Sequence, residues 1–113
     1  MLDSDTLLPA RHRRVGWEAF CELDRRPLLL DVRRHDEFDS GAVRDALNVP
    51  LHELEQRMGE LPLGEIWVYC HSGFRAGIAA SLLQRAGHAV VHIDDDLSRV
   101  AELQLPVRGS VAA

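Results

Sequence analysis

Residues 66–76 read IWVYCHSGFRA, and this stretch decides how the chain folds. Its first four residues form the continuous apolar run that is typical of a strand buried on both faces of a parallel sheet. A short polar segment with a glycine follows, and then Ala79, Leu82 and Leu83 recur at helical spacing. The stretch therefore predicts a buried strand, a cysteine, a short loop and a helix, in that order.

Two more apolar runs of the same kind flank this unit, LLLDV at residues 28–32 and AVVHI at residues 89–93. The segments between them predict a short helical turn at residues 36–39, a brief strand at residues 46–49 and an amphipathic helix at residues 51–61. Strands that alternate with helices indicate a mostly parallel sheet with helices on both faces. We therefore predict an α/β fold.

The length and composition favour one domain. A chain of 113 residues, of which 46% are hydrophobic, suits a single globular core. Residues 1–16 show no clear period and are predicted to be a loosely attached lead-in. The domain is predicted to cover residues 17–107, and residues 108–113 to be a frayed tail.

Composition argues against several classes of partner. The net charge of -5 gives no electrostatic reason to expect a nucleic acid or an anionic membrane. The sequence shows neither a membrane span nor the order of a signal peptide, so the expected compartment is the cytoplasm.

The contexts of Cys21 and Cys70 suggest neither a disulfide framework nor a zinc site, and Cys21 is predicted to pack in the core. The six histidines show no ligand spacing, so no metal is expected.

The position of Cys70 suggests chemistry. It stands at the carboxyl end of a parallel strand, where open α/β sheets bind ligands. Backbone N–H groups in a tight loop that enters a helix converge, and together with the helix dipole they stabilise a thiolate. Arg75 and His71 would add positive charge, and Gly73 permits a sharp backbone path. The alternative is that Cys70 is a small buried hydrophobic residue at a strand end.

Several motifs, taken in order, resemble the successive signatures of the rhodanese family. They are DVR at 31–33, DEF at 36–38 with Gly41, ALNVP at 46–50, and VYCHSGFRA at 68–76. The resemblance covers roughly residues 17–107. It implies a five-stranded parallel sheet flanked by helices, and a cysteine that accepts a sulfane sulfur from a donor such as thiosulfate and passes it to a thiophilic acceptor.

The resemblance also implies roles for single residues. Cys70 would carry the sulfur without a metal or an organic cofactor. The loop around it would bind the substrate, with Arg75 as the anion contact: His71, Ser72, Gly73, Phe74 and Arg75. Four residues separate Cys70 from Arg75, one fewer than in the phosphatase signature, which disfavours phosphatase chemistry. Asp31 and Arg33 are predicted to be structural, with an ion pair between Arg33 and Glu37 that fixes the next loop.

Two departures from the family pattern stand out. Ala76 replaces a hydroxyl residue that helps to hold the persulfide in many relatives. The run DDD at residues 94–96 lies where the family has a glycine pair. We expect these aspartates to cap the last helix. Alternatively, they would narrow the pocket and repel a dianion such as thiosulfate.

These observations predict a sulfurtransferase that works by a ping-pong mechanism. It would move a sulfane sulfur from thiosulfate or a low-molecular-weight persulfide to a thiol or cyanide, through a Cys70 persulfide. The alternative is a non-catalytic sulfur carrier or protein-binding module. The acidic residues 94–96 and the ASLL helix resemble rhodanese modules appended to persulfide-oxidising enzymes of the metallo-β-lactamase fold. That resemblance implies a persulfide or glutathione persulfide, rather than thiosulfate, as donor, and a protein sulfur acceptor or a persulfide-oxidising enzyme as partner.

Overall fold

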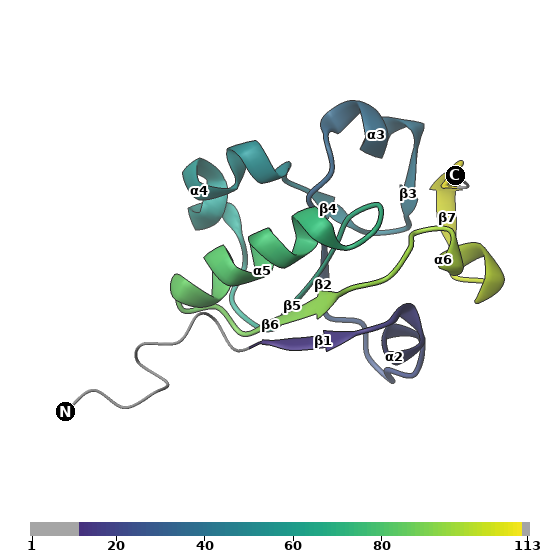
Figure 1. Ribbon diagram of the computed structural model, residues 1–113, viewed down its shortest axis with the longest axis horizontal. Coiled ribbons are helices and arrows are strands. Elements are labelled where there is room, and N and C mark those ends of the chain that lie inside the picture. Colours follow the sequence, from purple (N-terminus) through teal and green to yellow (C-terminus); the bar gives the residue numbers. More distant parts are fainter. Residues whose placement is uncertain (1–11, 112–113) are drawn as a thin grey trace.

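Five parallel strands form the central sheet of the computed structural model, which describes residues 12–111 (Figure 1). Their order across the sheet is β1 (Arg13–Val15), β6 (Val90–Ile93), β5 (Ile66–Tyr69), β2 (Leu28–Asp31) and β4 (Leu47–Asn48). A separate antiparallel pair is made by β3 (Gly41–Val43) and β7 (Val107–Gly109). The predicted α/β fold with a five-stranded parallel sheet is confirmed.

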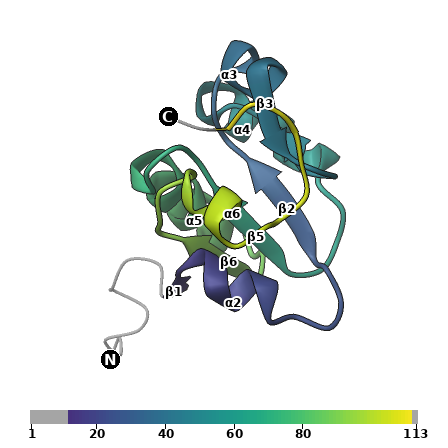
Figure 2. The same ribbon diagram turned by 90° about the vertical axis from the view of Figure 1, so that its right-hand side faces the viewer.

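In the described residues the helices that connect the strands are short, except for α5, which has twelve residues. They are α2 (Trp17–Cys21), α3 (His35–Ser40), α4 (Leu54–Arg57), α5 (Phe74–Arg85) and α6 (Arg99–Glu102). The amphipathic helix predicted at residues 51–61 is divided into α4 and two 3-10 turns, η1 (Leu51–Glu53) and η2 (Met58–Glu60). Gly59 lies inside this segment, and its conformational freedom disfavours a continuous helix. Figure 2 shows the same elements turned by 90°.

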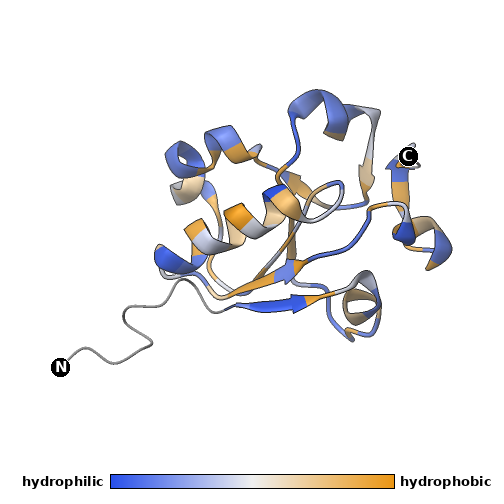
Figure 3. Cartoon of the chain, viewed as in Figure 1, coloured by the Kyte–Doolittle hydropathy of each residue, from blue (hydrophilic) through white to orange (hydrophobic). Residues whose placement is uncertain are grey.

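The core consists of two layers, one on each face of the sheet. Because successive side chains of a strand point to opposite faces, Ile66, Val68 and Cys70 belong to the cluster under α5. Trp67 and Tyr69 belong to the other cluster, which includes residues of α2 and α6. Figure 3 shows apolar colouring on the central strands and polar colouring over most of α3 and β1. The side chain of Cys70 therefore lies on the α5 face.

The lead-in prediction is wrong for residues 13–15. These residues form β1, which pairs in parallel with β6, so that Arg14 lies opposite His92. β1 is an edge strand with two exposed arginines, so its sequence lacks the apolar pattern of an inner strand. Residues 1–11 of the predicted lead-in lie outside the described residues.

The predicted tail also contains ordered structure. β7 continues to Gly109, and the Ser110 N–H donates to the Ser40 carbonyl at 3.0 Å. Val111 is buried in the core cluster on the α2 face. β7 pairs with β3 outside the main sheet. Its sequence therefore lacks the continuous apolar run of a buried central strand. Residues 112 and 113 lie outside the described part.

Among residues 12–111, no helix combines the length and hydropathy needed to cross a membrane.

A buried ion pair fixes the carboxyl end of β2. Arg33 donates two hydrogen bonds to Asp31 Oδ2, at 2.8 and 3.1 Å, and one to the Gly41 carbonyl at 2.6 Å. Burial alone would lower the pKa of Arg33, but the hydrogen bonds and charge of Asp31 outweigh burial and raise it. The prediction of an ion pair between Arg33 and Glu37 is wrong. The Arg33 guanidinium binds Asp31, at the end of the same strand, instead.

The Asp31–Arg33 pair yields a prediction about stability. Asp31→Asn leaves the Arg33 charge buried without a counter-charge, which costs about 3 to 5 kcal/mol in the free energy of unfolding. The double variant Asp31→Asn with Arg33→Met removes that charge and should recover part of the loss. Urea unfolding of the three proteins measures both effects. A loss under about 1 kcal/mol in the single variant would show that the pair does not support the fold.

Candidate functional site

The thiol of Cys70 sits in a cradle of backbone N–H groups. The residue follows β5 directly, and α5 begins at Phe74. The Cys70 Sγ accepts hydrogen bonds from the amides of Gly73 at 3.1 Å and Ala76 at 3.3 Å. The amino end of the twelve-residue α5 also points its positive dipole toward the sulfur. These groups favour a negative charge on sulfur, either a thiolate or a persulfide anion.

Gly73 gives the loop its shape. Its φ of +111° lies in the region that favours glycine. A Cβ at this position would also collide with Asp94 Oδ1 and would lie 3.2 Å from the Asp94 Cα. Both conformation and space therefore require glycine at the point where the loop turns into α5.

His92 supports the loop from below. Its Nε2 lies 2.8 Å from the Gly73 carbonyl, and because a carbonyl only accepts, Nε2 carries the proton. A Cβ at Gly77 would lie 3.1 Å from the imidazole, so the missing side chain on α5 makes room for the ring. Burial lowers the pKa of His92, which keeps the ring neutral at pH 7. Its Nδ1 has no hydrogen-bond partner among the described residues.

The three aspartates have different roles, and one of them, Asp96, acts as the predicted cap. α6 begins at Arg99, and its N-cap, Ser98, makes no side-chain cap bond. Asp95 Oδ2 instead accepts the Trp17 N–H at 3.0 Å, so it binds the start of α2. Asp96 Oδ1 accepts the Ser98 N–H at 2.9 Å. The capping prediction is confirmed for Asp96, whose carbonyl also accepts the Arg99 N–H at 3.0 Å in the turn that opens α6, and it is wrong for Asp94 and Asp95.

The third aspartate and its neighbours hold the loop from the side. Asp94 packs against Gly73, as the close approach above shows. One turn further, the Leu97 N–H donates to the His71 carbonyl at 2.7 Å. The segment after β6 therefore contacts the Cys70 loop at two points. In this chain, aspartate at position 94 occupies space directly beside the loop.

Arg75 reaches across to α3. Its Nη1 lies 2.7 Å from Glu37 Oε1, and its Nη2 lies 3.2 Å from Glu37 Oε2. The hydrogen bonds from Arg75 are the main cause that lowers the pKa of Glu37 to about 2. The same pair raises the pKa of Arg75, to which the nearby Cys70 charge also contributes. Arg75 is thus fixed by a carboxylate, and its predicted role as an anion contact stays a prediction.

The other predicted site residues lie around the same loop. Phe74 is 77% exposed, so it neither fills the core nor packs inward. Ser72 is exposed and His71 is half-buried. The methyl group of Ala76 is buried, and although it supplies no hydroxyl, its backbone N–H reaches the sulfur. Asp31 and Arg33 lie at the end of the neighbouring strand β2 and do not touch the sulfur.

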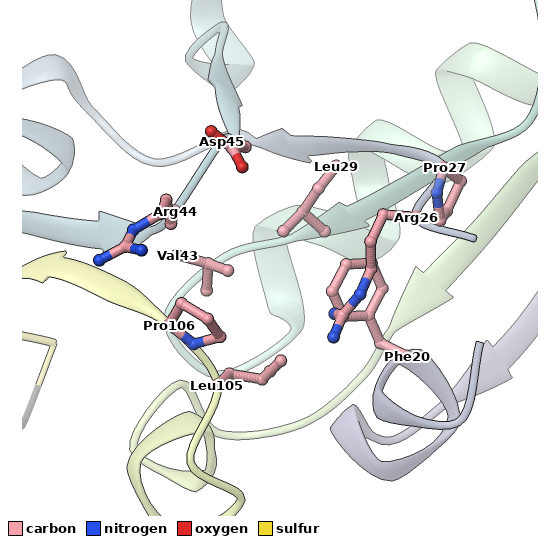
Figure 4. A pocket seen from close by; sticks show the side chains of 9 residues that line it. All are labelled: Phe20, Arg26, Pro27, Leu29, Val43, Arg44, Asp45, Leu105 and Pro106. Carbon is pink, nitrogen blue, oxygen red and sulfur yellow. The ribbon is translucent and has the colours of Figure 1, made fainter. Parts of the chain in front are cut away.

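A separate pocket lies on the other face of the sheet (Figure 4). It has a volume of about 220 Å³ and includes no residue of the Cys70 loop. Its lining residues are Phe20, Arg26, Pro27, Leu29, Val43, Arg44, Asp45, Leu105 and Pro106. Because the Cys70 thiol points to the α5 face, this pocket is not part of the candidate site.

Two contacts at the site, those of His92 with Gly73 and of Glu37 with Arg75, were not predicted from the sequence. His92 lies in a run that predicts only an apolar strand. A histidine in a strand buried on both faces needs a hydrogen-bond partner, and this need indicates a contact with a neighbouring segment. The Glu37–Arg75 pair had no signal of its own. It depends on where α3 packs, and the sequence spacing of 38 residues does not indicate a contact.

Comparison with known sequences bears on the whole domain. Residues 19–102 match the family model described as the Rhodanese-like domain. A sulfurtransferase of Allochromatium vinosum is 37% identical over 65 residues, which are 57% of this chain and 61% of that protein. A putative sulfur carrier protein of Bacillus subtilis is 37% identical over 77 residues, which are 65% of this chain and 42% of that protein. The chain therefore spans less than two thirds of either relative.

Solved structures agree on the fold. A rhodanese-related protein from Thermoplasma volcanium superposes with a TM-score of 0.78, at 24% identity, over 86% of this chain and 98% of that one. The reduced CoADR-RHD protein of Bacillus anthracis gives a TM-score of 0.66 at 30% identity, over 75% of this chain but only 16% of that one.

The close contact at Gly73 leads to a prediction with a built-in control. Gly73→Ala imposes an unfavourable φ and a clash with Asp94, whereas Gly87→Ala imposes a similar φ of +98° with no atom within 4 Å. We expect Gly87→Ala to cost about 1 kcal/mol and Gly73→Ala clearly more. Gly73→Ala should also change the alkylation rate of Cys70. Urea unfolding and iodoacetamide kinetics measure these effects, and equal behaviour of the two variants would contradict the analysis.

The Glu37–Arg75 pair leads to a prediction about pH. Since folding lowers the pKa of Glu37 from 4.5 to about 2, the pair stabilises the fold above pH 4.5 and loses this effect as the pH falls toward 2. Glu37→Gln should therefore cost about 1 kcal/mol at pH 7, and less at pH 3. Glu55→Gln, at an exposed position, is the control. A cost that stays constant between pH 7 and pH 3 would show that the charge of Glu37 is not responsible.

Proposed function

The chain belongs to the Rhodanese-like domain family, and from this premise we propose that it is a sulfurtransferase whose sulfur carrier is Cys70. Thiosulfate or a low-molecular-weight persulfide would donate the sulfane sulfur, and a thiol or cyanide would accept it. The observation that carries the proposal is the convergence of the Gly73 and Ala76 amides on the Cys70 sulfur. The reaction belongs in the cytoplasm, where free thiols such as Cys21 and Cys70 stay reduced.

The transfer takes place in two displacement steps. The Cys70 thiolate attacks the outer sulfur of the donor, the sulfur–sulfur bond of the donor breaks, and sulfite or a thiolate leaves with the bonding electron pair. Cys70 then carries a persulfide. In the second step the acceptor attacks the terminal sulfur, and the Cys70 thiolate leaves. The donor is reduced as the acceptor is oxidised, so no further oxidant or reductant is needed.

The cradle supports both steps. Two N–H donors and the dipole of α5 favour the anion that attacks in the first step and leaves in the second. The donors belong to the backbone and are already in place, so they need no reorganisation during the reaction. His92 and Glu37 act as positioning residues, because they hold Gly73 and Arg75 and do not touch the sulfur.

One observation favours the second candidate, a sulfur carrier that holds its sulfur for a partner protein. Cys70 is only 2% exposed, and a buried persulfide is protected from small thiols in solution. The putative sulfur carrier protein of Bacillus subtilis is among the similar proteins. A protein sulfur acceptor or a persulfide-oxidising enzyme would then be the partner. Slow release to cyanide and to small thiols, after efficient loading, would distinguish the carrier from the enzyme.

Mass spectrometry of the intact protein tests the proposal. Incubation with thiosulfate, or separately with glutathione persulfide, should add one sulfur atom that a reducing agent removes. Cys70→Ser should abolish the gain, because it removes the nucleophile. Cys21→Ser is the matched control and should keep the gain, since Cys21 packs in the other core layer. A sulfur gain that persists in Cys70→Ser would exclude Cys70 as the carrier.

A further inference from the structure

The pocket of Figure 4, on the α2 face of the sheet, has the composition of a site for a small ligand. We call it the α2-face pocket. Its volume of about 220 Å³ lies below the range of about 300 to 1,000 Å³ that is typical of drug-sized ligands, so a ligand that it encloses is small. Four separate segments build it: α2, residues 26–29, residues 43–45 and residues 105–106.

The floor of the α2-face pocket is apolar and belongs to the core. Four buried members of the core layer on this face line it: Phe20, Leu29, Val43 and Leu105. Core side chains are closely packed and keep their positions whether or not a ligand is present. The floor is therefore formed before a ligand binds.

Backbone hydrogen bonds fix the walls of the α2-face pocket. The Arg44 N–H donates to the Pro106 carbonyl at 3.0 Å, which joins the turn after β3 to the segment before β7. The Val43 N–H donates to the Tyr69 hydroxyl oxygen at 3.2 Å, which ties β3 to β5. Because these contacts hold the walls together, a ligand does not have to order the chain, and binding avoids that entropic cost.

Arg26 places a cation at one end of the α2-face pocket. Its guanidinium carbon lies 4.6 Å from the centroid of the Phe20 ring, and Figure 4 shows the side chain lying over that ring. Within residues 12–111, Arg26 binds no carboxylate, in contrast to the arginines of the ion pairs elsewhere in the domain: Arg33, Arg34, Arg57, Arg75 and Arg99. A guanidinium that stacks on an aromatic ring keeps its N–H groups free to bind a planar anion.

Asp45 places an anion at the other end. Figure 4 shows it on the far side of Leu29 from Arg26, and its carboxylate forms no ion pair with another residue of the described part. The Arg44 guanidinium points away from Leu29 and Phe20 in the same view. The α2-face pocket therefore favours one negative charge at the Arg26 end of a ligand and disfavours a second one at the Asp45 end.

We propose that the α2-face pocket binds a small apolar monocarboxylate. The carbon skeleton of the ligand lies on Leu29, Val43 and Leu105, and its carboxylate accepts hydrogen bonds from the Arg26 guanidinium. A phosphate ester is a poorer match, because it carries close to two negative charges at pH 7 and the pocket offers it one guanidinium. This site is independent of sulfur transfer, since the Cys70 thiol lies on the other face of the sheet.

Three related probes test the charge requirement. trans-Cinnamate carries one carboxylate, trans-cinnamamide is its neutral analogue, and trans-4-carboxycinnamate carries a second carboxylate at its opposite end. Binding is followed by the chemical shifts of the Leu29 and Val43 amides during NMR titration. We expect cinnamate to bind with a dissociation constant of about 1 mM or lower. Each of the other two should bind about fivefold more weakly, which is the upper end of what one exposed charge pair contributes.

Four variants locate the effect. Arg26→Gln should give cinnamate and cinnamamide equal affinities, whereas Arg25→Gln, at an exposed position outside the pocket, should keep the preference. Asp45→Asn should remove the disadvantage of the dicarboxylate, and asparagine tolerates the φ of +69° at this position. Cys70→Ser should bind cinnamate as the unchanged protein does.

Three results would overturn the proposal. The first is the absence of shifts at Leu29 and Val43 with cinnamate, or shifts confined to other parts of the domain. The second is equal affinity of the unchanged protein for cinnamate and cinnamamide. The third is a preference for cinnamate that survives in Arg26→Gln.

Discussion

The amides of Gly73 and Ala76 reach the Cys70 sulfur together only while Gly73 keeps its left-handed backbone. This conformation is unfavourable for other residues, and the rest of the domain maintains it. His92 holds the Gly73 carbonyl from the strand below, and Asp94 occupies the space beside the glycine. The sheet supplies the platform, since β5 and β6 end side by side at the loop.

Two ion pairs lie around the loop, one buried and one half-buried. Asp31 and Arg33 form a buried pair that fixes the end of β2 and reaches β3. Glu37 and Arg75 form a half-buried pair further out, which ties α3 to the start of α5. The Asp31–Arg33 pair contributes to the stability of the fold, because both of its charges are buried away from water and each needs the other as its counter-charge. The outer pair keeps some contact with solvent, and it fixes the orientation of the Arg75 guanidinium.

The sequence predicted the parts of the fold that are buried on both sides. The apolar runs of β2, β5 and β6 have an unmistakable pattern because each strand has neighbours on both edges and layers on both faces. β1 and β7 lie at edges, and their arginines carry no such pattern. Cys70 could be singled out because its position depends on local order alone. The Glu37–Arg75 pair could not, because it depends on how two distant segments pack.

In the proposed reaction, the backbone of the loop holds the sulfur, whereas its exposed side chains remain available to partners. Backbone groups hold the sulfur, so the missing hydroxyl at Ala76 removes only one further donor and leaves the amide of the same residue in place. The side chains of Ser72 and Phe74 point to solvent, and they are free to vary without disturbing the cradle. In this chain, contacts with a sulfur donor or acceptor are therefore expected at the exposed side chains of the loop, Ser72 and Phe74, and at Asp94, which lies against Gly73.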